Sequence, residues 1–237
     1  MAIAFDAAVV QNDNSTTEQT IAHTCTGSNL LLLVGFITNN ATDIITGVTY
    51  NSVAMTRLDA QQGDDSSFYS YVYGLLGPAT GANNVVVSAS GTSLIWTCVT
   101  SYTGVAQSGL PDSSNSAVNN TASSWTINTT TVADNCWVYC HNRGSDMTYS
   151  SPDTARCTSN QSHSGDSNAA ITPAGSYTIN GTCAADVTHQ TMIALSFAPA
   201  TAAGPANLKS YNTNLKANIK SIDTNLIANI KSIDTNV

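Results

Sequence analysis

The sequence has very few charged residues. Only 9% of its 237 residues are Asp, Glu, Lys or Arg, whereas about 25% is usual for a soluble domain. No lysine occurs before Lys209, and Glu18 is the sole glutamate. A surface with so few charges is covered mainly by hydroxyl and amide groups, which is common on extracellular and virion β proteins and unusual for cytosolic enzymes.

The few charges are distributed unevenly. Residues 1–206 hold three arginines and thirteen acidic residues, a formal charge of −10, and residues 207–237 hold four lysines and two aspartates, a charge of +2. Such an acidic body argues against a nucleic-acid partner, because phosphate binding needs a basic face. Opposite charges on two parts of one chain attract between copies as readily as within one copy.

Long apolar runs are also missing. The run LLLVGFI (residues 31–37) has the length of a strand, and a membrane-spanning helix needs about 20 apolar residues, so we expect no membrane span. The N-terminal MAIAFDAAVV has no basic region, and Asp6 interrupts it, so no ordinary secretion signal is visible. Prior removal of a signal, export by another route and release as a virion part all stay open.

Signatures of catalysis are absent. The sequence has no P-loop, no G-x-S-x-G and no dinucleotide fingerprint, and a glycosidase needs two suitably placed carboxylates. The four histidines lack metal-ligand spacing and are predicted to be ordinary surface or turn residues: His23, His141, His163 and His189. We expect no enzyme activity, no metal and no other cofactor.

The pattern up to residue 198 is one of short strands and turns. Segments rich in Val, Ile, Thr and aromatic residues are bounded by Gly, Pro, Asn, Asp or Ser, which predicts an all-β sandwich or jelly roll. In FYSYVY (residues 68–73) the tyrosines alternate with the other residues, so they share one face, either as core or as a sugar-stacking surface. We expect strands at residues 4–10, 20–24, 29–38, 44–50, 53–58, 68–76, 84–90, 94–102, 124–128, 136–142, 168–172, 176–180 and 191–198. Residues 50–53 (YNSV) are predicted to form a tight hairpin turn.

Six cysteines favour disulfides in an oxidising location, with buried thiols as the alternative. They are Cys25, Cys98, Cys136, Cys140, Cys157 and Cys183. Six cysteines allow fifteen connectivities, and the sequence argues against one pair. In an extended CWVYC run, the Cα atoms of Cys136 and Cys140 lie about 13 Å apart, which is too far for a disulfide.

The C-terminal part is a linker followed by a repeat. Residues 199–206 are rich in Pro, Ala and Gly, a composition that stops the last strand and stiffens the chain. Residues 207–237 repeat with a period of 11, as NLKSYNTNLKA, NIKSIDTNLIA and NIKSIDTNV. We therefore divide the chain into a jelly-roll sandwich at residues 1–198, a linker at 199–206 and an assembly tail at 207–237.

The apolar residues of the tail are spaced three and four apart. This 11-residue period fits a right-handed coiled coil, but the remaining Asn, Ser, Thr and Asp residues are poor helix formers, so we favour extended or β structure over a helix. Either structure leaves an apolar stripe that needs a partner. The predicted assembly residues are Leu208, Lys209, Tyr211, Leu215, Lys216, Ile219, Lys220, Ile222, Leu226, Ile230, Lys231, Ile233 and Val237.

Several stretches together resemble a known family. These are GVTYNSVAMTR (residues 47–57), GLLGPATGANNVVVSASG (74–91), SYTGVAQ (101–107) and GDSNAAITPAGSYTIN (165–180). They are similar to bacterial and phage-borne jelly-roll surface proteins, which often carry tail repeats of the form IKSxNG, approximated here by IKSIDTN. The resemblance implies a jelly-roll body in a virion or extracellular appendage and implies no enzymatic activity. This chain has Asp-Thr where Asn-Gly is usual in the repeat.

These observations predict a structural subunit that self-assembles into an extracellular helical filament, with the tail packing against neighbouring copies. The alternative is a carbohydrate- or receptor-binding module of a phage tail fibre or head, with a trimerising tail. The expected partner is a second copy of the chain, with glycans as possible ligands. The expected location is extracellular, on a fibril or cell surface, or in a virion.

Overall fold

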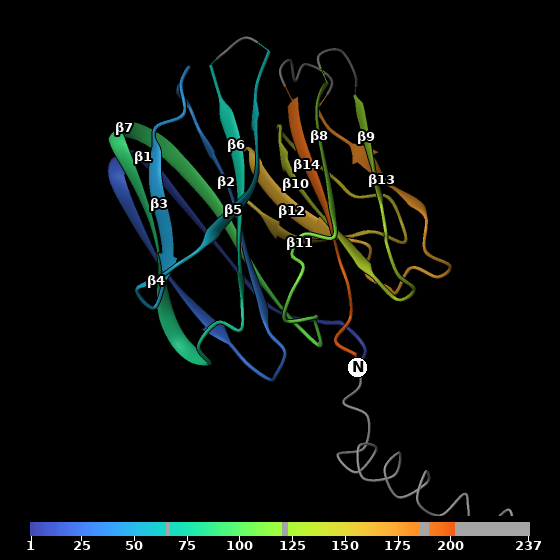
Figure 1. Cartoon of the computed structure of the whole chain (residues 1–237). Coiled ribbons are helices and arrows are strands. Elements are labelled where there is room, and N and C mark those ends of the chain that lie inside the picture. Colours follow the sequence, from blue (N-terminus) through green and yellow to red (C-terminus); the bar gives the residue numbers. More distant parts are fainter. Residues whose placement is uncertain (65–66, 120–122, 185–189, 202–237) are drawn as a thin grey trace, which may run out of the picture. The chain divides into compact units, whose positions relative to one another are not determined.

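The computed structural model describes residues 1–64, 67–119, 123–184 and 190–201. The chain divides into two units, Met1–Ala200 and Thr201–Val237. The described residues form strands, turns and no helix, so the prediction of an all-β body is confirmed. The strands (Figure 1) are β1 (Ala4–Cys25), β2 (Leu31–Thr38), β3 (Ile45–Tyr50), β4 (Val53–Ala54), β5 (Thr56–Gln62), β6 (Tyr69–Leu76), β7 (Gly81–Thr103), β8 (Ser113–Asn119), β9 (Ser124–Thr130), β10 (Trp137–Arg143), β11 (Thr154–Thr158), β12 (Ser162–Asp166), β13 (Ser176–Thr182) and β14 (Gln190–Phe197).

The described strands form three sheets. The seven-stranded sheet has the order β4-β3-β7-β2-β6-β5, with β1 on the other side of β7. The five-stranded sheet has the order β11-β12-β10-β14-β8, and β13 pairs with β9 in a third, two-stranded sheet. All pairs are antiparallel. This arrangement is sandwich-like, and the jelly-roll topology stays a prediction.

β1 and β7 are much longer than the sequence predicts. They pair from Ala4↔Thr103 to Cys25↔Gly81, where we expected four shorter strands. The polar residues 11–19, expected to turn, continue the ladder with shifts of register between Asp13 and Glu18. β-Bulges bend a ladder without ending it, so a turn-like composition is accommodated inside one long strand.

The predicted hairpin turn at residues 50–53 is confirmed. Tyr50 pairs with Val53, and the two residues between them both have positive φ, 49° at Asn51 and 63° at Ser52. Positive φ at both central positions defines a type I′ turn, whose twist matches that of the flanking strands. Asn adopts this conformation more readily than most residues, which is why the local sequence predicts the turn.

The sequence prediction is least accurate in the five-stranded sheet. β8, β11 and β12 were not expected, because SSNSAVN, TARCT and SHSGD are mainly small or polar. β8 and β12 form strands by pairing with the apolar strands β14 and β10, and β11 pairs in turn with β12. The expected strand at residues 168–172 is wrong, since it contributes a single bridge, Cys136↔Ile171.

The described part of the molecule contains three apolar cores, and each is separated from the next by shared strands. The first is formed within the seven-stranded sheet, the second joins that sheet to β10 and β14, and the third joins β10 and β14 to β9 and β13. β2, β10 and β14 are buried on both faces because each contributes to two cores. In β2, for example, Leu32 and Val34 belong to the first core, and Leu31 and Leu33 belong to the second.

The tyrosine face of β6 is core. Tyr71 and Tyr73 are buried in the first core and stack on Phe36, at ring-centroid distances of 5.0 and 5.8 Å. Val72 points the other way, into the second core. The predicted alternation of faces is therefore confirmed, and these two rings serve packing.

Between the seven-stranded and five-stranded sheets, the apolar contacts give way to polar ones. His141 Nδ1 and the Tyr139 hydroxyl both bond to Ser164 Oγ, at 3.0 and 2.8 Å, and Ser70 bonds to Thr191. A Cβ added at Gly35 of β2 would clash with the His141 ring and the Tyr139 hydroxyl. Glycine at this position therefore lets β2 of the seven-stranded sheet pack closely against β10 of the five-stranded sheet.

Candidate assembly interface

The predicted assembly residues, from Leu208 to Val237, lie outside the described residues. The structure does describe the point where the body ends. Ala200 donates a backbone hydrogen bond to Gly104 at 2.7 Å, and the Met1 amino group donates one to the Ala200 carbonyl at 2.6 Å. Val105 and Pro199 form an antiparallel bridge beside them. Pro199 and Ala200, at the end of the body, are thus fixed next to the start of β1.

One edge of the seven-stranded sheet is formed by β1. Among the described residues, β1 pairs with β7 alone, over 22 residues. A long edge strand presents unpaired backbone groups and is a template for an added strand. The edge is partly protected, because Cys157 and Ser159 donate hydrogen bonds to the Val9 carbonyl and to Asn12 Oδ1, at 3.2 and 2.6 Å. The stretch after residue 18 is the better template for strand addition.

An apolar groove of about 340 Å³ lies beside β5, β6 and the loop after β7. Three leucines that pack against the second core also line the groove: Leu58, Leu76 and Leu110. A Cβ on Gly74 would clash with Leu58 and Leu110, so the glycine helps to keep the groove open. The size and lining of the groove suit an aliphatic side chain. It is lined by Thr56, Leu58, Gly74, Leu75, Leu76, Gly109 and Leu110.

The three arginines of the body are engaged within it. Arg57 pairs with Asp43, Arg156 pairs with Asp166 at 2.8 Å, and buried Arg143 lies over the Phe68 ring, 3.7 Å from its centroid. Several carboxylates are exposed, among them Glu18, Asp134 and Asp146. The surface of the body is therefore negative, which favours a positively charged partner.

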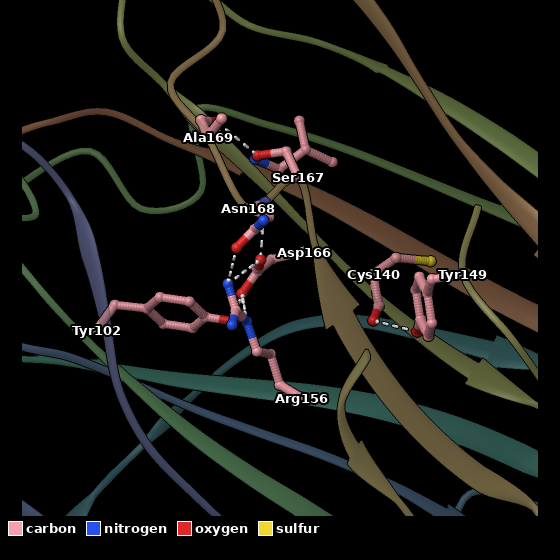
Figure 2. A network of polar contacts seen from close by, with 9 residues as sticks. Tyr102, Cys140, Tyr149, Arg156, Asp166, Ser167, Asn168 and Ala169 are labelled. Atoms are coloured by element: carbon pink, nitrogen blue, oxygen red, sulfur yellow. Dashed lines mark hydrogen bonds and ion pairs between the residues drawn. The ribbon is translucent and has the colours of Figure 1, made fainter. Parts of the chain in front are cut away.

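A buried carboxylate, Asp166 at the end of β12, has the densest set of polar contacts. It accepts two hydrogen bonds from Arg156, at 2.8 and 2.9 Å, one from the Tyr102 hydroxyl at 2.9 Å and one from the Asn168 backbone at 2.8 Å (Figure 2). Its side chain has no exposed surface. Burial, with the nearby Asp166 charge, raises the pKa of Tyr102 well above its usual value. Because Asp166 is fully bonded and inaccessible, this network suits a structural role, joining β7, β11 and β12.

The other contacts drawn in Figure 2 also tie segments of the five-stranded sheet together. The Tyr149 hydroxyl donates to the Cys140 carbonyl at 3.1 Å, and Ser167 Oγ donates to the Ala169 carbonyl at 3.0 Å. Ser167 also meets the Val138 amide, at 3.3 Å. These bonds hold the segment before β11 and the loop after β12 against β10.

Asp6, His23 and Ser101 are the residue types of a hydrolase triad, but their order is different. In a triad the histidine lies between the serine and the acid. Here Ser101 lies in the middle, 3.0 Å from His23 Nε2 and donating to Asp6 at 2.7 Å. Ser101 is fully buried, and burial lowers the pKa of His23 against the opposing effect of Asp6. The group links β1 to β7 and gives no substrate access to the hydroxyl.

The prediction that the histidines lie at the surface or in turns is wrong for three of them. His23, His141 and His163 are buried in strands, and His189 lies outside the described residues. Burial, with the neighbouring His163, lowers the pKa of His141 to about 3, and burial also lowers the pKa of His163. Isolated histidines in polar stretches give no signal of burial, because their hydrogen-bond partners lie in other segments, 19 to 78 residues away in the sequence.

The six cysteines, all within the described residues, are buried, and no two sulfurs are at bonding distance. The disulfides expected from the even count are therefore not formed in this structure. The cysteines occupy core positions instead: Cys25 lies in the first core, and Cys140 and Cys183 lie in the third. The count alone does not separate disulfides from buried thiols, because both place cysteine in the interior.

No group of three or more His, Cys, Asp and Glu residues that could hold a metal ion occurs in residues 1–64, 67–119, 123–184 and 190–201. A helix long and apolar enough to cross a membrane is likewise not found in these ranges. Comparisons with models of protein families, with curated proteins and with solved structures gave no match. The resemblance to jelly-roll surface proteins therefore stays a prediction.

Proposed function

We propose that this chain is a structural subunit that assembles into an extracellular helical filament, and that its C-terminal repeat joins one copy to the next. The observation that carries the proposal is the repeat itself: nine apolar residues at regular spacing follow a body that ends at a fixed position, Ala200. Contacts from the tail of one copy to the body of the next close into a ring only if the rotation between copies permits it. Otherwise they generate an open helical filament.

The body supports this proposal because it has surfaces that suit the tail. The groove beside β5 and β6 accepts an aliphatic side chain, and the β1 edge accepts an added strand. Each fully buried Leu or Ile contributes roughly 1.5–3 kcal/mol. Nine such residues would contribute roughly 13–27 kcal/mol, compared with a cost of association of about 4–15 kcal/mol.

Charge supports the same partner. The tail carries every lysine of the chain, Lys209, Lys216, Lys220 and Lys231, and the body is strongly acidic. Because the body's own arginines are engaged in internal contacts, its exposed carboxylates are available to lysines of another copy. Such contacts at the rim of an interface guide association and register more than they add affinity.

The test is a full-length variant in which residues 207–237 keep their composition but lose the three-and-four spacing of apolar residues. Net charge, length and mean hydropathy are then unchanged. We expect negative-stain micrographs to show filaments for the parent protein and dispersed particles for the shuffled variant. Filaments of equal length from the shuffled variant would contradict the proposal.

One observation favours the alternative function, a receptor- or carbohydrate-binding module. A polar hollow of about 360 Å³ lies at the β3–β4 hairpin, and amides and hydroxyls there suit a hydroxyl-rich ligand such as a sugar. It is lined by Thr49, Asn51, Ser52, Ala82, Asn83, Asn84 and Val86. A closed trimer in light scattering, together with glycan-array binding that Asn83→Ala abolishes, would favour this function over the filament.

A further inference from the structure

Cys98 and Cys157 come from different sheets and meet in the interior. Cys98 lies in β7 of the seven-stranded sheet, and Cys157 lies in β11, the edge strand of the five-stranded sheet. Cys157 Sγ contacts the carbonyl of Val9, and the next residue of β1, Val10, is the ladder partner of Cys98. Although 58 residues separate them in the sequence, the fold places them on neighbouring strands that face each other.

The surrounding backbone fixes both thiols in this position. Cys98 Sγ donates to the Ser162 carbonyl of β12 at 3.3 Å, so it reaches across to the five-stranded sheet. Cys157 Sγ donates to the Val9 carbonyl of β1 at 3.2 Å, so it reaches in the opposite direction. Val10, the next residue along β1, is the ladder partner of Cys98. The two side chains thus cross the same gap between the sheets from opposite sides.

Access to the pair differs between the two sulfurs. Cys98 has no exposed surface, whereas Cys157 is 6% exposed and lines a surface hollow of about 160 Å³. The hollow is formed by β1 and β11, with Val9 and Arg156 on its walls. A small reagent can therefore reach Cys157 first, and Cys98 is in place to react second.

We propose that Cys98 and Cys157 form a disulfide that joins the two sheets when the protein meets a small disulfide oxidant. The Cys157 thiolate attacks one sulfur of the oxidant, which breaks the S–S bond of the oxidant and releases one thiol. The Cys98 thiolate then attacks Cys157 Sγ and releases the second thiol. Two electrons pass to the oxidant, and the two protons lost by the cysteines are balanced by those on the two released thiols.

The bond would close a loop of about 60 residues and restrict the unfolded chain. It would also fasten β11, an edge strand, to the long β1–β7 pair. Burial raises the pKa of the Cys98 thiol well above its usual value, with the Cys157 contact adding to this effect. The second step is therefore expected to speed up between pH 7 and pH 9, since it needs the thiolate.

The test uses full-length protein and 2-hydroxyethyl disulfide. After oxidation, blocking of remaining thiols and peptic digestion without reductant, mass spectrometry is expected to find one linked peptide pair, joining Cys98 to Cys157. Four blocked cysteines are expected per chain, and the melting temperature is expected to rise by about 10 °C. Cys157→Ser should abolish both the link and the shift, and Cys136→Ser, the matched control, should keep them.

Six blocked cysteines in the oxidised parent protein, or a linked peptide joining any other pair in place of Cys98 and Cys157, would overturn the proposal. The thiol count and the peptide map are made on the parent protein. They therefore decide the question even if a serine variant does not fold. The outcome is independent of filament formation, so this inference and the proposed function can fail separately.

Discussion

The body and the tail differ in whether they can bury their own apolar side chains. Within the described residues the body buries its apolar side chains in three cores of its own, and its three arginines are engaged internally. The tail has an apolar residue every third or fourth position, four lysines and only 31 residues, too few for a core of its own. The difference suggests that folding belongs to the body and assembly to the tail, so that changes to one should leave the other intact.

The largest effect on folding is expected from removing the cation of the buried network. Arg156→Met leaves Asp166 buried without its charged partner, and breaking a buried pair in this way costs about 3–5 kcal/mol of unfolding free energy. Arg57→Met is the matched control, because its pair with Asp43 is exposed and contributes about 0–1 kcal/mol. Urea unfolding measures both.

The same variant tests the separation of roles. Arg156→Met is expected to form filaments normally at temperatures where it remains folded, because the network is internal. If it folds and yet forms no filaments, the buried network of the body contributes to assembly, which contradicts the separation of folding and assembly between body and tail.

A smaller effect is expected where the two sheets approach most closely. In Gly35→Ala the new methyl group clashes with His141 and Tyr139, and overpacking of this kind costs about 1–3 kcal/mol. Gly47→Ala, in β3 of the same sheet, has no atom within 4 Å of the new Cβ and should change stability by less than about 0.5 kcal/mol. Scanning calorimetry that ranks the two variants in the reverse order would refute the close approach.

The body should also lose stability in mild acid. His141 has a folded pKa of about 3, below its unfolded value of about 6.5. The unfolded chain therefore binds more protons, so the stabilisation is complete above pH 6.5 and is lost as the pH falls toward 3. Between pH 7.5 and 4.5 the loss from His141 is about 2–3 kcal/mol.

Urea unfolding at the two pH values checks this expectation. His141→Asn keeps a polar side chain but removes the titrating ring, so its stability should depend less on pH than that of the parent protein. An identical pH dependence in both proteins would show that the imidazole is not held neutral by burial.

The smallest effect is expected from the charges of the tail. Replacing Lys209, Lys216, Lys220 and Lys231 by Gln should slow filament growth and reduce its dependence on salt, because rim charges steer association and contribute less than about 1 kcal/mol each. Replacement by Arg keeps the charge and should preserve the growth rate. Light scattering at low and high salt measures filament growth. Equal growth rates of the Gln and Arg variants would contradict the role of the lysine charges in association.

Local chemistry made part of the body predictable. The Tyr50–Val53 turn follows from the preference of Asn for positive φ, and the burial of β2 follows from the run LLLVGFI. β12, with the sequence SHSGD, gave no such signal, because its strand structure depends on neighbours far away in the sequence.

The polar networks of the body were harder to predict. Asp6 bonds to Ser101 only after β1 pairs with β7, and Arg156 and Tyr102 share Asp166 although they come from different sheets. No motif joins these residues in the sequence. The same holds for Cys98 and Cys157, where the cysteine count indicated an interior position but not a partner. The repeat in the tail, by contrast, is fully visible in the sequence.

The most direct test of the separation between body and tail is truncation after Pro205, with two measurements on the same protein. We expect the urea unfolding midpoint of the body to stay within error of the full-length value, and filaments to disappear from negative-stain micrographs. Filaments formed by the truncated protein would contradict the account, because the body would then assemble without the tail.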